Sequence, residues 1–414
     1  MADPSDGSRA GGEAAPDRRL SAGRGRRRDR RVYLRRYPLL FTLLAATRGR
    51  PVLRLGRTLV VHGPDGYLDA LTRTPLDRAA AGTVGGTAHR LGTDSLLFDQ
   101  QGPEHRQARR ALTDDLGPAG VARLRPVWTA LLRQRLAPLG DGAEVDLVAV
   151  VAELAGATTA ALLGVDADPV ALARAARRAA AATAAEQLPG PRLPGRARAA
   201  RRAVADLTAL LGGSPPGTDP ADPLDPPDPP DPRGLPDPPT PSDQPGPSPE
   251  RAGLAGMLAL AAVNTTVAAI PRAVAWCADD RLWAQADAAE TRDVLVDELL
   301  RVTAPSPVLP RVAAGAATVA GCPVRAGDRL LLVARHAAGA HRADPDCAAP
   351  EPARTARLVF GAGAHSCPGA RLARAQLADA LAALAPYRPI VVRARADGHA
   401  ALPGWAQLVI RAGR

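Results

Sequence analysis

The chain has 414 residues, of which 46% are hydrophobic and only 3% aromatic, and its formal net charge at pH 7 is +11. The apolar content is enough for a sizeable core, so wholesale disorder is excluded, and the scarcity of aromatic residues argues against a stacking platform for single-stranded nucleic acid. Four scattered cysteines are too few for a disulfide framework, and the best early apolar run, residues 37–46, is about half the length of a membrane span.

All 53 basic residues are arginine, and near the N-terminus they cluster at residues 18–19 and 24–36. A nucleic-acid interface would need a basic stripe joined to a recognisable binding module, and none is visible. Two interpretations of the cluster stay open, a solvated basic tail and an electrostatic docking patch. The polar N-terminus lacks the apolar core of a signal peptide, so the sequence predicts a cytoplasmic protein.

The first elements are predicted as follows. Residues 1–30 have no apolar periodicity, so we expect a disordered basic leader, followed by a single domain over residues 31–414. Residues 51–56 and 58–62 predict two short strands joined by a Gly-Arg turn. A helix from Pro64 to about Arg73 follows them.

A long helical region occupies the middle of the chain. Residues 77–97 are rich in Gly, Thr and Arg and predict a long loop before it. From Glu104 to Leu211 the chain is predicted to be largely helical. The expected breaks lie near Gly117, Gly140, Gly164 and Gly190.

Residues 213–250 interrupt the domain. Sixteen of these 38 residues are proline and seven are aspartate. Because proline lacks the backbone N–H and fixes φ, such a stretch can hold neither a helix nor a sheet ladder. We expect a disordered insert within one domain, and a proline-rich ligand for a partner is the alternative.

The rest of the chain is again mainly helical. Helices are predicted over residues 252–270, 273–284, 291–303 and, after a glycine-rich loop, 370–384. Short strands are predicted at residues 308–312, 318–319 and 330–333. Helices with a few small sheets place the chain in the mostly α (α+β) class.

The chemistry is concentrated in Phe360-Gly-Ala-Gly-Ala-His-Ser-Cys-Pro-Gly369. Two glycines one residue apart permit a tight turn with positive φ, which lets backbone approach a flat ligand. Cys367 precedes an alanine-rich helix, where N–H groups favour a thiolate, and an enclosed thiolate suits a soft metal such as heme iron. Two alternatives stay open: an inert buried cysteine, and a zinc site of His365, Cys367, His341 and Cys347, which lacks the close Cys-x2-Cys spacing of structural zinc sites.

This loop resembles the heme-binding signature of the bacterial cytochrome P450 family, Phe-Gly-x-Gly-x-His-x-Cys-x-Gly, and matches it at every fixed position. The resemblance implies the P450 fold, a helical body with small sheets around a buried heme b. It also implies that Cys367 is the axial iron ligand, pushing electron density toward O–O cleavage. The other loop residues at the cofactor would be Phe360, Gly361, His365 and Gly369.

Three further matches follow the order of the family. Glu298 and Arg301 match its Glu-x-x-Arg helix pair, although any i, i+3 ion pair on a helix surface would look the same. His105 and Arg109 match a His-x-x-x-Arg that places two cations on one helix face, suited to a heme propionate. Arg311 resembles another propionate-binding arginine.

The central helix departs from the family pattern. Where the family carries Ala-Gly-x-Asp/Glu-Thr-Thr, this chain has Ala261-Ala262-Val-Asn264-Thr265-Thr. Thr265 matches the threonine that supports proton delivery, but Ala262 replaces the glycine that leaves room for oxygen and Asn264 replaces the acid. An amide can hold water but cannot exchange a proton at neutral pH. We assign proton delivery to Thr265 helped by Asn264 and ordered water, and the alternative is that both merely bend an apolar helix.

The segment before the heme loop departs as well. The family's Pro-x-x-Phe element, whose arginine completes a Glu-Arg-Arg cluster, has no clear match between His341 and Phe360. Arg342 and Arg354 are the candidates for its replacement.

The resemblance implies a soluble heme-thiolate monooxygenase. It would take electrons from NAD(P)H through a ferredoxin or flavodoxin and its reductase, and insert one atom of O2 into an apolar small molecule, as a secondary-metabolite tailoring hydroxylase or epoxidase. Segments 77–97, 258–262 and 307–309 are expected to face the substrate, and neither nucleic acid nor membrane is expected as a partner. The rivals are a heme-thiolate enzyme that is not a monooxygenase (peroxide-driven, isomerase, dehydratase or coupling catalyst) and a non-catalytic heme-binding or ligand-binding protein.

Overall fold

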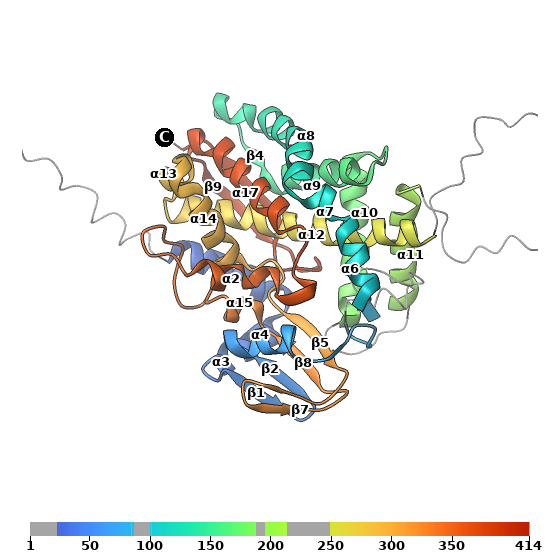
Figure 1. Cartoon of the computed structure of the whole chain (residues 1–414). Helices are drawn as coiled ribbons and strands as arrows, with labels where there is room; N and C mark the ends of the chain where they lie inside the picture. The colour runs from blue at the N-terminus through green and yellow to red at the C-terminus, as the bar shows by residue number, and fades with distance from the viewer. Residues whose placement is uncertain are drawn as a thin grey trace, which may run out of the picture.

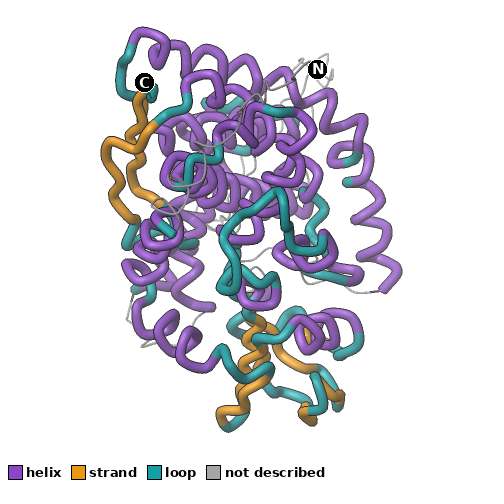
Figure 2. The backbone as a smooth tube through the Cα atoms, turned by 90° about the vertical axis from the view of Figure 1, so that its left-hand side faces the viewer, coloured by secondary structure: helices purple, strands orange, loops and turns teal. Residues whose placement is uncertain are grey.

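The computed structural model describes residues 23–83, 85–86, 100, 102–187, 195–212 and 249–413. Residues 1–22, residues 213–248 of the predicted insert and most of segment 84–99 lie outside these ranges, and the predictions made for them stay untested. Figure 1 shows a broad helical body with a small sheet at one end, and Figure 2 shows the same arrangement from the side. This architecture is the mostly α class that the sequence predicts.

The helices of the first half of the chain are α2 (Arg24–Arg36), α3 (Pro38–Thr47), α4 (Pro64–Thr72), α6 (Gly102–Ala111), α7 (Thr113–Leu116), α8 (Pro118–Leu136), α9 (Leu147–Leu163), α10 (Pro169–Gln187) and α11 (Arg196–Leu210). Those of the second half are α12 (Pro249–Asp279), α13 (Trp283–Asp287), α14 (Ala289–Thr303), α15 (Ala334–Ala337), α16 (Ala353–Ala356) and α17 (Ala370–Leu384). The predicted bounds of the last helix are confirmed, because its leucines and alanines repeat at helical spacing and bury one face.

The described strands form three sheets. The largest has the order β1-β2-β8-β5-β3, with β1 (Val52–Leu55), β2 (Thr58–Val61), β8 (Arg329–Leu332), β5 (Leu309–Ala313) and β3 (Leu76–Asp77). The second has the order β4-β10-β9, with β4 (Val145–Asp146), β10 (Trp405–Arg411) and β9 (Ile390–Ala396). The third pairs β6 (Ala317–Val319) with β7 (Cys322–Val324). The predicted hairpin at the start of the chain is confirmed as β1 and β2, which pair antiparallel.

Helix α12 runs through the centre of the body and packs against α9, α10, α2 and α14 (Figure 1). The sequence predicts two separate helices over residues 252–270 and 273–284, and this division is wrong, because one helix continues through Pro271. The residues on both sides of it, among them Ile270 and Ala273, are buried in the main core. Their burial outweighs the roughly 3 kcal/mol that an interior proline costs a helix. Helix α12 is also long and apolar enough to cross a membrane, a property that core helices share.

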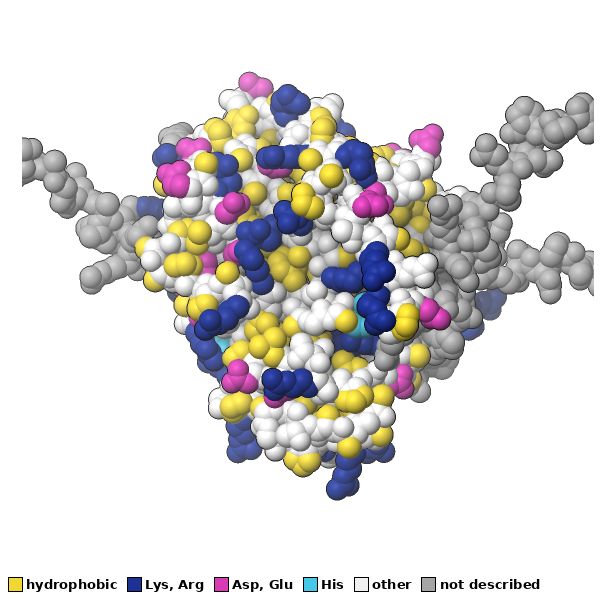
Figure 3. All heavy atoms as spheres, in the orientation of Figure 1, with side chains coloured by type: hydrophobic (Ala, Val, Ile, Leu, Met, Phe, Trp, Pro, Cys, Tyr) yellow, Lys and Arg dark blue, Asp and Glu magenta, His cyan; other side chains and the backbone are white. Residues whose placement is uncertain are grey.

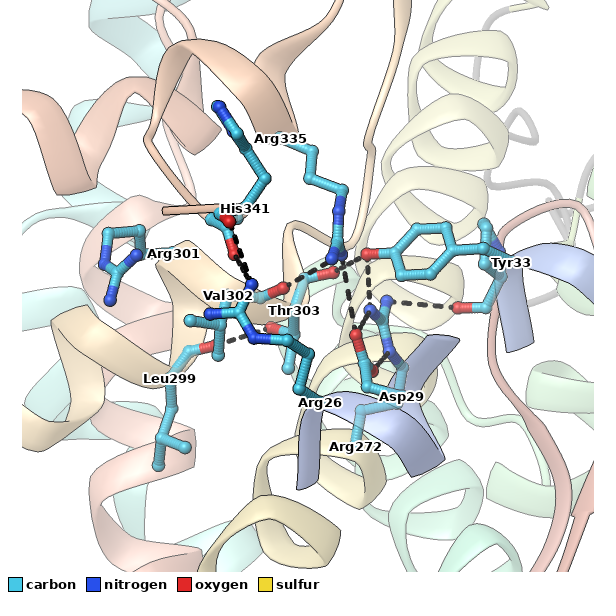
Figure 4. Close-up of polar contacts among 12 residues, drawn as sticks. Arg26, Asp29, Tyr33, Arg272, Leu299, Arg301, Val302, Thr303, Arg335 and His341 are labelled. Carbon is cyan, nitrogen blue, oxygen red and sulfur yellow. Dashed lines mark hydrogen bonds and ion pairs between the residues drawn. The ribbon is translucent and has the colours of Figure 1, made fainter. Parts of the chain in front are cut away.

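Helix α2 corrects the predicted leader, which was expected to extend to residue 30. The helix is fixed by Asp29, whose carboxylate accepts hydrogen bonds from Nε and Nη2 of the buried Arg272 at 2.7 and 2.9 Å. One helical turn later, the hydroxyl of Tyr33 donates to the carbonyl of Thr303 at 2.6 Å. Figure 4 shows these side chains converging between α2, α12 and the end of α14. The leader therefore ends before Arg24, and α2 belongs to the domain.

Candidate functional site

A cavity of about 460 Å³ lies at the centre of the molecule. Helix α12 contributes Ala261, Ala262 and Thr265 to its wall, and the loop of residues 360–369 contributes Phe360 and Cys367. Most of the remaining lining is apolar. The cavity therefore brings the predicted cysteine and the predicted threonine to one enclosed space.

The loop of residues 360–369 has the conformation that its glycines predict. Gly361 and Gly363 have φ values of +76° and +70°, a region that side chains with a Cβ rarely adopt. A Cβ at Gly363 would also lie 3.1 Å from the carbonyl oxygen of Leu71. The loop closes through a hydrogen bond of 2.8 Å from the N–H of Cys367 to the carbonyl of Phe360. The turn thus holds the cysteine at the cavity wall.

Cys367 is exposed to the cavity, and Gly361 and Gly369 lie beside it in the lining. Burial within the protein raises the pKa of its thiol, and this effect exceeds the lowering by the Gly369 N–H and by the charge of Arg109. The expectation of a thiolate at Cys367 concerns the metal-bound sulfur and stays a prediction. A soft metal that binds it displaces the proton.

The zinc alternative is not supported by the structure. His341 packs against His336, with 4.9 Å between the ring centroids, and the thiol of Cys347 points to the carbonyl of Thr291 at 3.7 Å. Neither residue lines the cavity that holds Cys367. Among the described residues, no group of three His, Cys, Asp or Glu side chains could hold a metal ion.

Two predicted cations lie beside the loop. The imidazole of His105 stacks on that of His365 with 3.8 Å between centroids. Arg109, one turn after His105, donates hydrogen bonds to the carbonyl and hydroxyl oxygens of Ser366 at 2.6 and 3.1 Å. The i, i+4 spacing thus places both side chains of α6 toward the loop, as the sequence predicts.

A bound anion would stabilise the buried basic side chains of this region. Burial, followed by the charge of Arg78, lowers the pKa of His365 to about 3, and burial lowers the pKa of His105 as well. Burial also lowers the pKa of Arg311, whose Nε is enclosed with no hydrogen-bond partner among the described residues. Arg311 lies on β5 and lines the cavity. Its Nη1 donates to the carbonyl of Pro310 at 2.8 Å, but the enclosed Nε is costly to leave without a partner unless a negative group binds there.

Arg78 lies in segment 77–97, which the sequence analysis expects to face the substrate, but its role as a cation of the cavity was not predicted. It lines the cavity, and burial, followed by the charge of Arg311, lowers its pKa to about 10. No ion pair joins it to another residue in the described part of the chain. A lone arginine in a Gly- and Thr-rich loop gives no signal in the sequence, because only the fold brings it to Arg311.

These features fit a heme. Its ring matches the apolar walls, its iron matches a sulfur ligand, and its two carboxylates match the arginines at the cavity. His105, Arg109, Arg311 and His365 would hold those carboxylates, together with Arg78. Phe360, Gly361, Cys367 and Gly369 would line the side of the ring that carries the sulfur.

Glu298 and Arg301 form a completely buried ion pair on α14. Arg301 donates from Nε and Nη2 to the two carboxylate oxygens of Glu298 at 2.9 and 2.6 Å. The interpretation as an ordinary surface pair is therefore wrong. The pair lies beneath the segment of residues 339–351, which it binds through backbone groups.

Neither candidate arginine completes this cluster: Arg342 and Arg354 are both exposed, and among the described residues neither forms an ion pair with Glu298. Arg301 instead donates to the carbonyls of Gly339 and Ala343, each at 3.2 Å. The Glu298 carboxylate accepts hydrogen bonds from the backbone N–H groups of Asp346 and Glu351 at 3.4 and 3.1 Å. Main-chain groups thus take the place of the third side chain.

The side chains of Asn264 and Thr265 donate hydrogen bonds to backbone carbonyls of the helices. The Asn264 amide donates to the carbonyl of Leu260 at 2.8 Å and to that of Ala176 on α10 at 3.3 Å. The Thr265 hydroxyl donates to the carbonyl of Ala261 at 2.7 Å. Both side chains line the cavity, but Asn264 ties α12 to α10 and its donors are occupied.

A second cavity of about 40 Å³ adjoins the first and was not foreseen. Thr158 and Thr159 of α9, Thr266 of α12 and Gln376 of α17 supply its polar lining. The Gln376 amide donates to the Thr158 hydroxyl at 3.0 Å. The volume and the polar groups are sufficient for an ordered water.

The predicted substrate-facing segments are confirmed in part. Leu258, Ala261 and Leu309 line the large cavity. Val308 does not, because it packs on the cluster around Leu44 on the other side of the sheet. Of segment 77–97, only the residues up to 83 and residues 85–86 are described, and among these Asp77, Arg78, Thr83 and Gly85 line the cavity.

No protein-family model matches this chain. A part of it is 39% identical over 145 residues to cytochrome P450 BJ-3 of Bradyrhizobium diazoefficiens, covering 30% of this chain and 33% of that protein. The chain thus matches about a third of the length of this curated relative.

Solved structures match over nearly the whole chain. One is a mutant of P450 EryK in complex with erythromycin B, with a TM-score of 0.68, 22% identity, and coverage of 91% of this chain and 96% of that one. Another is CYP109E1 from Bacillus megaterium in complex with testosterone, with a TM-score of 0.67, 18% identity, and coverage of 92% and 100%. A third is CYP164A2 from Mycobacterium smegmatis, with a TM-score of 0.65, 24% identity, and coverage of 90% and 99%.

Proposed function

From the cytochrome P450 fold of this chain, which the sequence motif predicts and the comparisons show, we propose that the protein is a heme-thiolate monooxygenase. It inserts one atom of O2 into a C–H or C=C bond of an apolar small molecule. The observation that supports this most directly is the cavity that Cys367 shares with Thr265 and with Arg311, whose Nε has no hydrogen-bond partner among the described residues.

The heme, when bound through Cys367, supplies the oxygen-activating chemistry, and the thiolate makes that chemistry favour O–O cleavage. The protein supplies binding and orientation. His105, Arg109, Arg311 and His365 bind the propionates, and the aliphatic residues of α12 and β5 position an apolar substrate and exclude water. Electrons come from NAD(P)H through a ferredoxin or flavodoxin and its reductase.

The proton path is assigned to two groups of this chain. The Thr265 hydroxyl can turn from the carbonyl of Ala261 into the cavity, where it can pass a proton. A water in the small cavity beside Thr266 can resupply that proton. The role of Asn264 is positional, because its amide donors hold α10 against α12.

The substrate is proposed to be a sizeable apolar molecule, and the reaction a hydroxylation or epoxidation in secondary metabolism. The apolar lining of the cavity supports this class. The similar structures with erythromycin B and testosterone are consistent with it. A cytoplasmic location is part of the same proposal.

The test is the reduced carbon-monoxide difference spectrum of the purified protein, followed by turnover with NAD(P)H, redox partners and a substrate that shifts the spectrum on binding. We expect the spectrum of a thiolate-ligated heme and a product one oxygen atom heavier. A protein that binds no heme, or a heme spectrum that does not report thiolate, would refute the proposal.

A second candidate is a peroxide-driven heme-thiolate enzyme. The observation in its favour is that Asn264, at the position of the usual acid, has both amide contacts on backbone carbonyls. Product formation with hydrogen peroxide alone, at rates well above those with NAD(P)H and partners, would favour this candidate. Ligand binding without turnover under either condition would indicate a non-catalytic protein.

A further inference from the structure

Helix α3 presents an apolar face to solvent. None of its ten residues is charged. On its inner face, Leu44 packs against Val60 of β2 and against Val333, which directly follows β8. Leu39 and Leu43, one turn apart on the outer face, are 86% and 45% exposed. A helix on the surface of a soluble protein normally has polar residues at such positions.

The surroundings of this helix are strongly basic. No aspartate or glutamate occurs between Asp29 and Asp65, and eight arginines lie in that interval. Arg31 and Arg35 on α2 and Arg48 and Arg50 after α3 are exposed and form no ion pair with the described residues. Figure 3 shows arginine side chains projecting from the end of the molecule that holds the five-stranded sheet, with apolar side chains between them.

We propose that Leu39 and Leu43, with Arg31 and Arg35 before them in the chain and Arg48 and Arg50 after them, form a surface that docks on an anionic phospholipid bilayer. The two leucines insert among the lipid chains near the headgroups, and the arginines contact the phosphates. A peripheral contact of this kind needs no spanning helix. The lengths of the apolar runs in the sequence test only for spanning helices, so they do not reveal a partner of this kind.

The geometry favours lipid over other anionic partners. Leu39 projects from the surface, whereas a protein partner would need a matching pocket and a larger apolar area. A bilayer accommodates projecting aliphatic side chains without such a pocket. Nucleic acid would use the arginines but gain nothing from two exposed leucines.

The same part of the fold reaches the large cavity. Strand β5 belongs to the same sheet as β1 and β2, and its residues Leu309 and Arg311 line the cavity. If α3 contacts a bilayer, the five-stranded sheet connects that contact to the substrate cavity. The bilayer would then be a nearby source of apolar molecules.

The experiment measures binding of the full-length, heme-loaded protein to vesicles by flotation. One set of vesicles is pure phosphatidylcholine, and the other contains about one third phosphatidylglycerol. We expect the partition coefficient to be at least tenfold higher on the anionic vesicles, and to fall as salt is raised.

The variants separate the two parts of the surface. Leu39→Gln with Leu43→Gln should lower binding to anionic vesicles at least tenfold with the net charge unchanged. Arg31→Gln with Arg35→Gln should lower it about 25-fold, since each arginine near an anionic surface contributes about fivefold. The matched controls are Leu210→Gln and the pair Arg198→Gln with Arg201→Gln, exposed residues of α11 that should change binding less than twofold.

Three outcomes would overturn the proposal. The first is no binding of the unchanged protein, or equal binding to both kinds of vesicle. The second is an equal loss in the α11 controls, which would indicate unspecific attraction by net charge. The third is unchanged binding of the leucine variant together with tight binding of a DNA duplex, which would assign the arginines to nucleic acid. None of these outcomes depends on catalysis, so they do not bear on the proposed reaction.

Discussion

Replacing Arg301 with methionine removes a cation that is fully buried and leaves the Glu298 carboxylate behind it. That carboxylate keeps the N–H groups of Asp346 and Glu351 but loses both bonds from the guanidinium. The carbonyls of Gly339 and Ala343 lose their donor as well. Breaking a buried pair in this way costs about 3–5 kcal/mol of the free energy of unfolding. We expect a loss in this range.

The assay is urea unfolding of the heme-loaded protein, followed by circular dichroism. The matched control is Arg135→Met, which removes a pair with Glu153 whose arginine is 47% exposed and should cost less than about 1 kcal/mol. Adding Glu298→Leu to Arg301→Met should recover part of the loss, because no unpaired charge stays buried. If Arg301→Met costs no more than Arg135→Met, the buried pair does not stabilise the fold as argued here.

Four further predictions concern the site and the rest of the chain. Cys367→Ala should abolish the thiolate signature in the reduced carbon-monoxide spectrum, and an unchanged spectrum would exclude Cys367 as the ligand. Thr265→Ala should raise peroxide release and Asn264→Asp should alter the coupling of NAD(P)H use to product; if both match the unchanged protein, these residues are not on the proton path. Replacing residues 213–248 with a short Gly/Ser linker should leave heme content and melting temperature nearly unchanged, because loop length adds only about 0.6 kcal/mol per doubling, whereas loss of heme would show a structural role. Burial, and then the neighbouring His62, lower the pKa of His336 to about 3. The neutral form of His336 therefore contributes fully to the free energy of unfolding above about pH 6.5, and this contribution is lost as the pH falls. His336→Gln should therefore flatten the decrease in unfolding free energy between pH 6.5 and 5 by up to about 2 kcal/mol, and an identical pH profile would contradict this.

The features that the sequence predicts well are local. The glycine turn before Cys367 and helix α17 after it depend on neighbouring residues, so spacing alone describes them. Pro271 shows the opposite case, because the sequence marks a break and the burial of α12 on both sides overrides it.

Features that depend on distant parts of the chain were not predictable. Arg78 was expected to face the substrate as part of segment 77–97, but its place near Arg311 depends on the pairing of β3 with β5. Helix α2 looks like a basic tail until Asp29 is seen to bind Arg272, 243 residues away. A single acid within a run of arginines was the available signal. The C-terminal strands β9 and β10 were also missed, although residues 390–392 (Ile-Val-Val) and 408–410 (Leu-Val-Ile) are apolar runs that favour a strand.

The contacts of Glu298 and Arg301 have a consequence for sequence variation. Because the segment over the pair contributes carbonyls and N–H groups, its side chains are free to change without loss of these bonds. Proline is the exception at two positions, since it would delete the N–H of Asp346 or of Glu351. The chain places proline at 345 and 350 instead, directly before each donor, where it restricts the unfolded backbone and leaves both N–H groups in place. A comparison of relatives should therefore find most side chains of this segment variable, glycine kept at 339 where φ is +70°, and no proline at 346 or 351.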